Sequence, residues 1–83
     1  MKLYSSSVCS SCLQLFAYMI DHPLDVEKVD ITESMANLRE FLALRDQRAE
    51  FAPIRESGAV GIHCLLTDDD RILFGKAIEA LIG

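Results

Sequence analysis

The sequence contains no apolar stretch long enough to cross a bilayer. Its longest uninterrupted apolar run, residues 15–20, has six residues, whereas a transmembrane helix needs about 20. A single lysine and no apolar core precede Cys9, so we expect no secretory signal. We therefore expect a cytoplasmic protein that does not bind a membrane.

Basic residues are also scarce. Eight Lys and Arg residues stand against 13 Asp and Glu residues, which gives a net charge of −5. Nucleic-acid surfaces need clustered cations, and the one local cluster, residues 44–48, is interrupted by Asp46. These features argue against a nucleic-acid partner. Three cysteines, an odd number, argue against a disulfide-stapled secreted domain and favour a reducing compartment with catalytic or metal-binding thiols.

The length of 83 residues predicts one domain, over residues 1–83, with a small core. Residues 2–6 suit a buried strand, and the small polar residues that follow suit the start of a helix. We expect this helix to end before Pro23, because His22 is biased out of the helical region. Its inward face is predicted from the helical spacing of four apolar residues. These are Leu13, Phe16, Ala17 and Ile20.

The rest of the chain predicts two strands that form a hairpin, one further strand and two further helices. Thr32 or Ser34 could cap the longer helix, and Arg45 falls on the same side of it as four apolar residues. In chain order we expect a strand over 24–31, a helix over 32–51, a short turn of helix over 53–58 that is closed by Gly58, hairpin strands over 60–66 and 71–74, and a helix over 76–83. The fold class is therefore α/β, in the order βαβαββα, with a four-stranded mixed sheet flanked by helices.

The stretch "SVCSSCLQ" places Cys9 and Cys12 three positions apart, at the expected junction of strand and helix. A helix N-terminus stabilises an anion, so a thiolate at Cys9 would have a lowered pKa and be nucleophilic. Cys12 lies one turn further on and should be more buried. This asymmetry suits thiol–disulfide exchange, in which the first cysteine attacks and the second resolves the mixed disulfide. Metal binding and inert buried cysteines remain alternatives.

The string "KLYSSSVCSSC", followed by this order of elements, resembles the glutaredoxin branch of the thioredoxin superfamily. It is most similar to small bacterial glutaredoxin-related proteins, over essentially the whole chain. The specific parts are "LYS", the C-x-x-C motif and the "GI-x-C-L" entry to the third strand. The resemblance implies a thioredoxin-like fold, with Cys9 as the nucleophile and Cys12 as the resolving thiol.

The sequence departs from this family at three places. The motif reads "CSSC", whereas glutaredoxins often have Pro-Tyr between the cysteines, and Ser6 stands where a basic residue that binds a glutathione carboxylate is common. His63 stands where the family has a cis-proline against the redox pair, and the sequence leaves both isomers of the Ile62–His63 bond open. His63 could be a tolerated strand residue, a base for the Cys9 thiol, or a metal ligand.

We therefore expect a monomeric thiol–disulfide oxidoreductase of glutaredoxin type, with Cys9 and Cys12 as catalytic residues. Its partners would be a disulfide-containing protein or a glutathione mixed disulfide, with glutathione as a cosubstrate or a reductase as electron donor, and no bound cofactor. Two alternatives are a zinc or iron–sulfur protein that uses Cys9, Cys12 and His63, and a redox-inactive member that binds a partner. Cys64 should point away from His63 and be buried. The residues expected around the substrate groove are Tyr4, Ser10, Ser11, Ile62, His63, Gly75 and Lys76.

Overall fold

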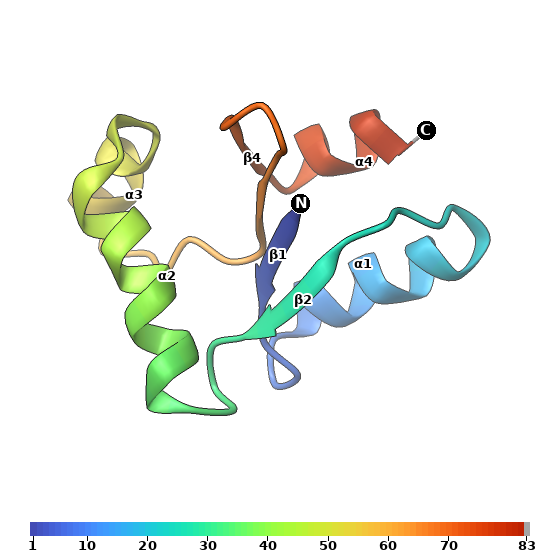
Figure 1. The fold of residues 1–83 in the computed structure, drawn as a ribbon, viewed down its shortest axis with the longest axis horizontal. Helices are drawn as coiled ribbons and strands as arrows, with labels where there is room; N and C mark the ends of the chain where they lie inside the picture. The colour runs from blue at the N-terminus through green and yellow to red at the C-terminus, as the bar shows by residue number, and fades with distance from the viewer. Residues whose placement is uncertain (83) are drawn as a thin grey trace.

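The computed structural model describes residues 1–82, and Gly83, the last residue of the predicted final helix, lies outside the described residues. Figure 1 shows short strands in the middle of the molecule with helices on both sides of them. No helix within residues 1–82 is long and apolar enough to span a membrane. The elements are β1 (Lys2–Ser5), α1 (Ser10–Asp21), β2 (Glu27–Asp30), α2 (Met35–Gln47), the 3₁₀ helix η1 (Ala49–Phe51), α3 (Ala52–Ser57), β3 (Cys64–Leu66), β4 (Ile72–Phe74) and α4 (Lys76–Ile82).

The four strands form one mixed sheet in the order β2-β1-β3-β4. β1 pairs with β2 in parallel, as expected for strands joined through a helix, and with β3 in antiparallel orientation. β3 and β4 form the expected antiparallel hairpin. This order and these directions confirm the predicted α/β class and form a thioredoxin-like fold.

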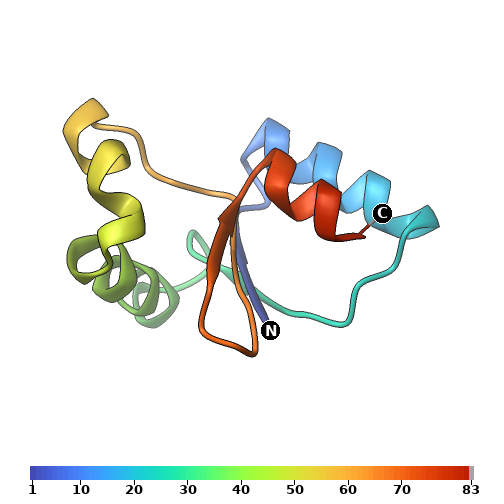
Figure 2. The same cartoon turned by 90° about the horizontal axis from the view of Figure 1, so that it is seen from above.

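Each face of the sheet carries its own half of the core. α1 and α4 cover one face, and α2, η1 and α3 cover the other, as Figure 2 shows from above. Alternation along β1 divides the core, because Leu3 points to the first face and Tyr4 to the second. On the second face Phe41 and Phe51 pack edge to face, with their ring centroids 5.8 Å apart.

The structure corrects the predicted inward face of α1. Leu13 is 48% exposed and Ile20 is 81% exposed, whereas Cys12 and Leu15 are buried. The helix begins with the Cys9 sulfur beside the amide of Cys12, so Cys12 faces the sheet. Phe16 and Met19, four and seven residues after Cys12, also pack against this half of the core. Of the four residues predicted to face inward, Phe16 does so, whereas Leu13, Ala17 and Ile20 are exposed.

Two predicted strands are shorter in the structure. The segment predicted over 24–31 pairs only at Glu27–Asp30, and the segment predicted over 60–66 pairs only at Cys64–Leu66. Of the two candidate caps for α2, Ser34 is the one used, since its side chain accepts the amide of Asn37 at 3.1 Å. α3 ends at Gly58, which has a φ of +77° and serves as the expected helix stop.

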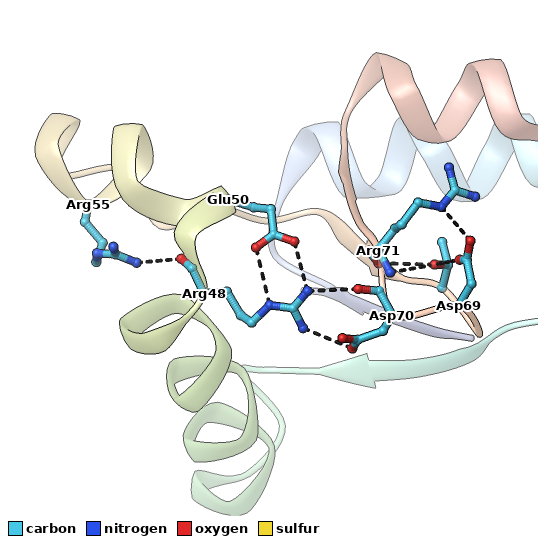
Figure 3. A network of polar contacts seen from close by, with 7 residues as sticks. Arg48, Glu50, Arg55, Asp69, Asp70 and Arg71 are labelled. Atoms are coloured by element: carbon cyan, nitrogen blue, oxygen red, sulfur yellow. Dashed lines mark hydrogen bonds and ion pairs between the residues drawn. The ribbon is translucent and has the colours of Figure 1, made fainter.

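Arginine side chains connect the α2–α3 region to neighbouring segments. Arg48 forms ion pairs with Glu50 at 2.9 Å and with Asp70 of the β3–β4 turn at 3.0 Å (Figure 3). Arg55 donates to the main-chain oxygen of Arg48 at 2.9 Å, which satisfies a carbonyl group at the end of α2. The exit from β3 is thereby attached to the end of α2.

Candidate active site

Cys9 is the N-cap residue of α1. Its backbone is extended, with φ −98° and ψ 117°, and its main-chain oxygen accepts the amide of Leu13 at 3.1 Å. Its sulfur accepts the amide of Cys12 at 3.3 Å, the hydrogen bond that a Ser or Asp oxygen makes in most N-caps. The reactive atom therefore lies at the positive end of the helix dipole, where a negative charge is favoured.

The surroundings of Cys9 favour its thiolate. Partial burial raises the pKa of Cys9, but hydrogen bonds from Cys12 and Ser11 outweigh this effect and bring the pKa below its ordinary value of 9.0. The Ser11 oxygen lies 3.2 Å from the Cys9 sulfur and donates its proton when the sulfur is ionised. Cys9 is half-buried, so a substrate sulfur can approach it.

Cys12 has the opposite character. Its side chain is completely buried, and burial, followed by its hydrogen bond to Cys9, raises the pKa of Cys12 to about 12. Both thiols are free, so the described state is the reduced one. The pair thus combines an accessible thiol of low pKa with an inaccessible thiol of high pKa, the asymmetry that the motif predicted.

Polar contacts from the β2–α2 connection hold the loop before Cys9. Ser6 is 2% exposed, and its hydroxyl lies 2.8 Å from the hydroxyl of Thr32. The same Ser6 oxygen accepts the amide of Val8 at 3.2 Å. The Asp30 carboxylate accepts the amide of Ser7 at 3.4 Å and that of Thr32 at 2.9 Å. Ser6, noted in the sequence only as a missing cation, therefore fixes the loop that carries Cys9.

A surface cleft of about 500 Å³ adjoins this loop through Thr32. Its lining includes the carboxylate of Glu33 and the exposed apolar side chain of Met35, and it contains no cationic side chain. No pattern in the sequence indicates this cleft directly, because the cleft depends on how the β2–α2 connection folds. Its lining residues are Ile31, Thr32, Glu33, Ser34, Met35 and Leu38.

His63 is buried just before β3, and the Ile62–His63 peptide bond is cis. Neither ring nitrogen has a hydrogen-bond partner among the described residues, so the imidazole makes no hydrogen bond to the Cys9 or Cys12 sulfur. Burial lowers the pKa of His63 below its ordinary value, although the nearby Glu79 carboxylate opposes this shift. The imidazole is therefore held in its neutral form, without the contact that a base for the Cys9 thiol would make.

The metal alternative required Cys9, Cys12 and His63 to converge. Within residues 1–82, no three His, Cys, Asp or Glu side chains come together in an arrangement that could hold a metal ion. The structure thus does not assemble these three residues into the ligand set that the alternative needs.

Two of the other candidate residues lie in the core. Tyr4 is 2% exposed, and its hydroxyl donates to Glu40 on α2 at 2.8 Å. Its ring packs in the core on the α2 face, where it lines a cleft of about 340 Å³ beside Glu40, and not on the face that carries α1. The reason is the alternation along β1, which turns Tyr4 toward α2 and away from α1. Cys64 is 1% exposed in the same half of the core, as expected, and burial raises its pKa to about 12.

The remaining candidates lie nearer the surface. Ser10 and Ser11 form the exposed first turn of α1, and Ser11 alone of the two contacts the Cys9 sulfur. Ile62 is half-buried against the core of the α2 face. Gly75 has a φ of +46° and precedes the exposed Lys76 at the start of α4, which lies beside α1 on the same face of the sheet (Figure 2).

Comparison with known proteins finds a bacterial relative. The chain is 33% identical over 64 residues to a protein of Haemophilus influenzae described as an uncharacterized protein, and the match covers 77% of this chain and 74% of the relative. The chain belongs to the same family as this protein. No protein-family model matches the chain, and no solved structure matches it. The family is thus represented here by a small thioredoxin-like α/β fold with a cysteine pair at the start of α1.

Proposed function

We propose that this protein is a thiol–disulfide oxidoreductase of glutaredoxin type. The observation that carries the proposal is the position of the Cys9 sulfur at the N-terminus of α1, where it accepts the amide of Cys12. That position lowers the pKa of Cys9, whereas burial raises the pKa of Cys12. One thiol is therefore ready to attack, and the other is protected until a mixed disulfide forms.

The exchange would proceed in two displacements. The Cys9 thiolate attacks one sulfur of the substrate disulfide, forms a mixed disulfide with it, and releases the other substrate sulfur as a thiolate. Cys12 then gives up its proton and attacks the Cys9 sulfur, which forms the Cys9–Cys12 disulfide and releases the second substrate thiol. The substrate gains two electrons and the pair loses two.

The oxidised pair must be reduced again by an external thiol donor. Two glutathione molecules or the dithiol of a reductase would supply the two electrons and two protons. The substrate would be a protein disulfide or a glutathione mixed disulfide. Ser11 would stabilise the thiolate, and the main chain around Ile62 would pair with an extended substrate.

The variant Cys12→Ser tests the proposal. It leaves Cys9 able to attack but removes the thiol that resolves the intermediate, so incubation with glutathione disulfide should leave one glutathione bound to Cys9. Mass spectrometry of the intact protein measures this adduct, and the Cys9→Ser variant should carry none. A Cys64→Ala background removes the third thiol as a competing site.

Failure would also be informative. If the Cys12→Ser variant forms no adduct and the wild-type protein turns over neither glutathione mixed disulfides nor protein disulfides, the protein is not an exchange enzyme. The chain would then be a fold member that binds a partner without redox chemistry.

A further inference from the structure

Arg45 reaches from α2 to the chain segment that leads into β3. Its Nε donates to the main-chain oxygen of Val60 at 3.0 Å, and its Nη2 donates to that of Ala59 at 2.6 Å. The two acceptors belong to consecutive residues, so the planar guanidinium holds this stretch of backbone through two N–H donors in a fixed geometry. A lysine ammonium has no such fixed pair of donors.

Residues 59–63 run past the start of α1, the helix that carries the cysteine pair. Figures 1 and 2 both show this segment passing from α3 to β3 close to the end of β1 and the start of α1. The main-chain N–H and C=O groups of Gly61 and Ile62 have no hydrogen-bond partner among the described residues. Main-chain donors and acceptors without partners are the groups to which an extended peptide adds by strand pairing.

The segment is fixed from a second side at Gly61. This residue has a φ of +98°, and a Cβ atom placed on it would lie 3.0 Å from Phe51 Cε1. Phe51 is fully buried, so it cannot move aside. The backbone is therefore in direct contact with the core at Gly61, while the Arg45 guanidinium holds the two residues before it.

The base of Arg45 is itself rigid. The main-chain oxygen of Arg45 accepts Nη1 of Arg55 at 2.6 Å, and the same Nη1 donates to the main-chain oxygen of Arg48 at 2.9 Å. These contacts attach α3 to the last turns of α2. A displacement of the segment at residues 59–63 would have to break the Arg45 bonds, because α2 cannot follow it.

We propose that Arg45 is a positioning residue for the substrate, whose guanidinium holds the main chain of residues 59–62 where an extended disulfide substrate pairs with it beside Cys9. The inference rests on the proposed exchange function. Arg45 makes none of the hydrogen bonds at the Cys9 sulfur, so it acts on the binding of a long substrate and not on the chemistry of the thiols.

The experiment compares Arg45→Met with Arg48→Met, a matched control from the same helix. Arg48 also makes several hydrogen bonds, but they go to Glu50 and to the turn at the far end of β3. Two probes are used: a ten-residue peptide carrying glutathione on a central cysteine, and hydroxyethyl disulfide, which is too small to pair with the segment. Thermal melting of both variants reports any loss of the fold.

For Arg45→Met we expect KM for the peptide to rise about five- to tenfold, because the variant loses the one or two hydrogen bonds that hold the substrate-binding segment. The kcat for the peptide and both constants for hydroxyethyl disulfide should change less than about twofold. Arg48→Met should leave KM for the peptide unchanged. Arg45→Lys can restore one of the two hydrogen bonds, and its KM should fall between those of the wild type and Arg45→Met. It also serves as the test variant if Arg45→Met does not fold.

The positioning role is overturned if Arg45→Met and Arg48→Met raise KM for the peptide equally, or if turnover of hydroxyethyl disulfide falls along with that of the peptide. It is also overturned if the wild-type protein is active and Arg45→Met has the same KM for the peptide as the wild type. A wild-type protein inactive on both probes overturns the exchange function and this inference with it. The two failures are thus distinguishable.

Discussion

The amide of Cys12 donates to the sulfur of Cys9 at 3.3 Å, so each cysteine sets the protonation of the other. The hydrogen bond favours charge on Cys9, and charge on Cys9 then disfavours charge on the buried Cys12. A sequence spacing of three residues makes the two thiols chemically different, because the first cysteine is the helix cap and the second lies in the first turn.

Alkylation of the reduced protein with iodoacetamide should therefore be selective for Cys9. Its rate should increase as the pH rises through the Cys9 pKa, with a midpoint below the ordinary value of 9.0, because the thiolate is the reacting species. Cys12, with a pKa of about 12 and no exposed surface, should remain unmodified. Peptide mapping after alkylation identifies the modified residue, and equal labelling of both cysteines would contradict the asymmetry.

Ser11→Ala should move the alkylation midpoint to higher pH. The variant removes the hydroxyl that lies 3.2 Å from the Cys9 sulfur, and with it one of the hydrogen bonds that lower the pKa of Cys9. The rate at pH 7 should fall a few-fold, while the limiting rate at high pH stays the same. Ser7→Ala is the control, since the Ser7 hydroxyl has no partner among the described residues. An unchanged midpoint in Ser11→Ala would leave the amide of Cys12 as the dominant contact.

The periodicity of the sequence predicted the four strands and the helices α1, α2 and α4, because each element carries its own local signal. The break between α2 and η1 was missed, since one helix was predicted over 32–51. β1, the helix caps and the turn at "TDDD" depend on residues close together in the chain. The inward face of α1 was wrong because two stripes, beginning at Cys12 and at Leu13, both satisfy helical spacing. The choice between them depends on the rotation that the Cys9 cap imposes, and this is a property of the folded loop.

The parts of the candidate site that depend on residues close together in the chain were also predicted from the sequence, and the parts that depend on distant residues were not. The C-x-x-C motif located the reactive pair, since its chemistry depends on a helix start that the sequence also marks. The roles of Ser6 and Arg45 were missed because their partners, Thr32 and the main chain of residues 59–60, lie 26 and about 15 positions away. The only signal for Arg45 was its place among apolar residues on one side of its helix.

His63→Leu should stabilise the protein by roughly 1 kcal/mol at neutral pH, because it replaces a buried imidazole without hydrogen-bond partners by an apolar side chain. It should also change the pH dependence. Burial lowers the pKa of His63 from 6.5, so the unfolded chain binds more protons below that pH and the wild type loses stability as the pH falls. His63→Leu should lose less stability between pH 7 and pH 5 in urea titrations.

The same variant tests whether His63 is a base for Cys9. Since the ring makes no hydrogen bond to either sulfur, the pH profile of Cys9 alkylation should be unchanged in His63→Leu. A midpoint displaced to higher pH would show that the imidazole helps to form the thiolate.

Tyr4→Phe should cost stability and leave exchange activity within about twofold of the wild type. The Tyr4 hydroxyl donates to Glu40, and this bond is the largest influence that lowers the pKa of the Glu40 carboxyl. The variant should lose about 1 kcal/mol at pH 7, and the difference should shrink as the pH falls below 4.5 and Glu40 is protonated. Tyr18→Phe is the control, since no hydrogen bond from the Tyr18 hydroxyl is found in the described residues. A large loss of activity in Tyr4→Phe would instead place Tyr4 in the groove.

Gly61→Ala and Gly58→Ala form a matched pair that separates backbone strain from steric contact. Both glycines have positive φ, but an added Cβ meets nothing within 4 Å at Gly58, whereas at Gly61 it lies 3.0 Å from Phe51 and 3.2 Å from Ile54. Gly58→Ala should cost about 1 kcal/mol, the penalty of a left-handed alanine. Gly61→Ala should cost about 2 to 4 kcal/mol, because the buried Phe51 ring must also be displaced.

Urea unfolding measures the free energy of unfolding of both variants. An unchanged m value shows that each variant exposes the same amount of surface on unfolding as the wild type. Because Gly61 lies in the segment that Arg45 holds, Gly61→Ala should also raise KM for a peptide disulfide, whereas Gly58→Ala should not. Equal destabilisation of the two variants would mean that the segment moves away from Phe51 at little cost. The substrate-pairing backbone would then be held by Arg45 alone.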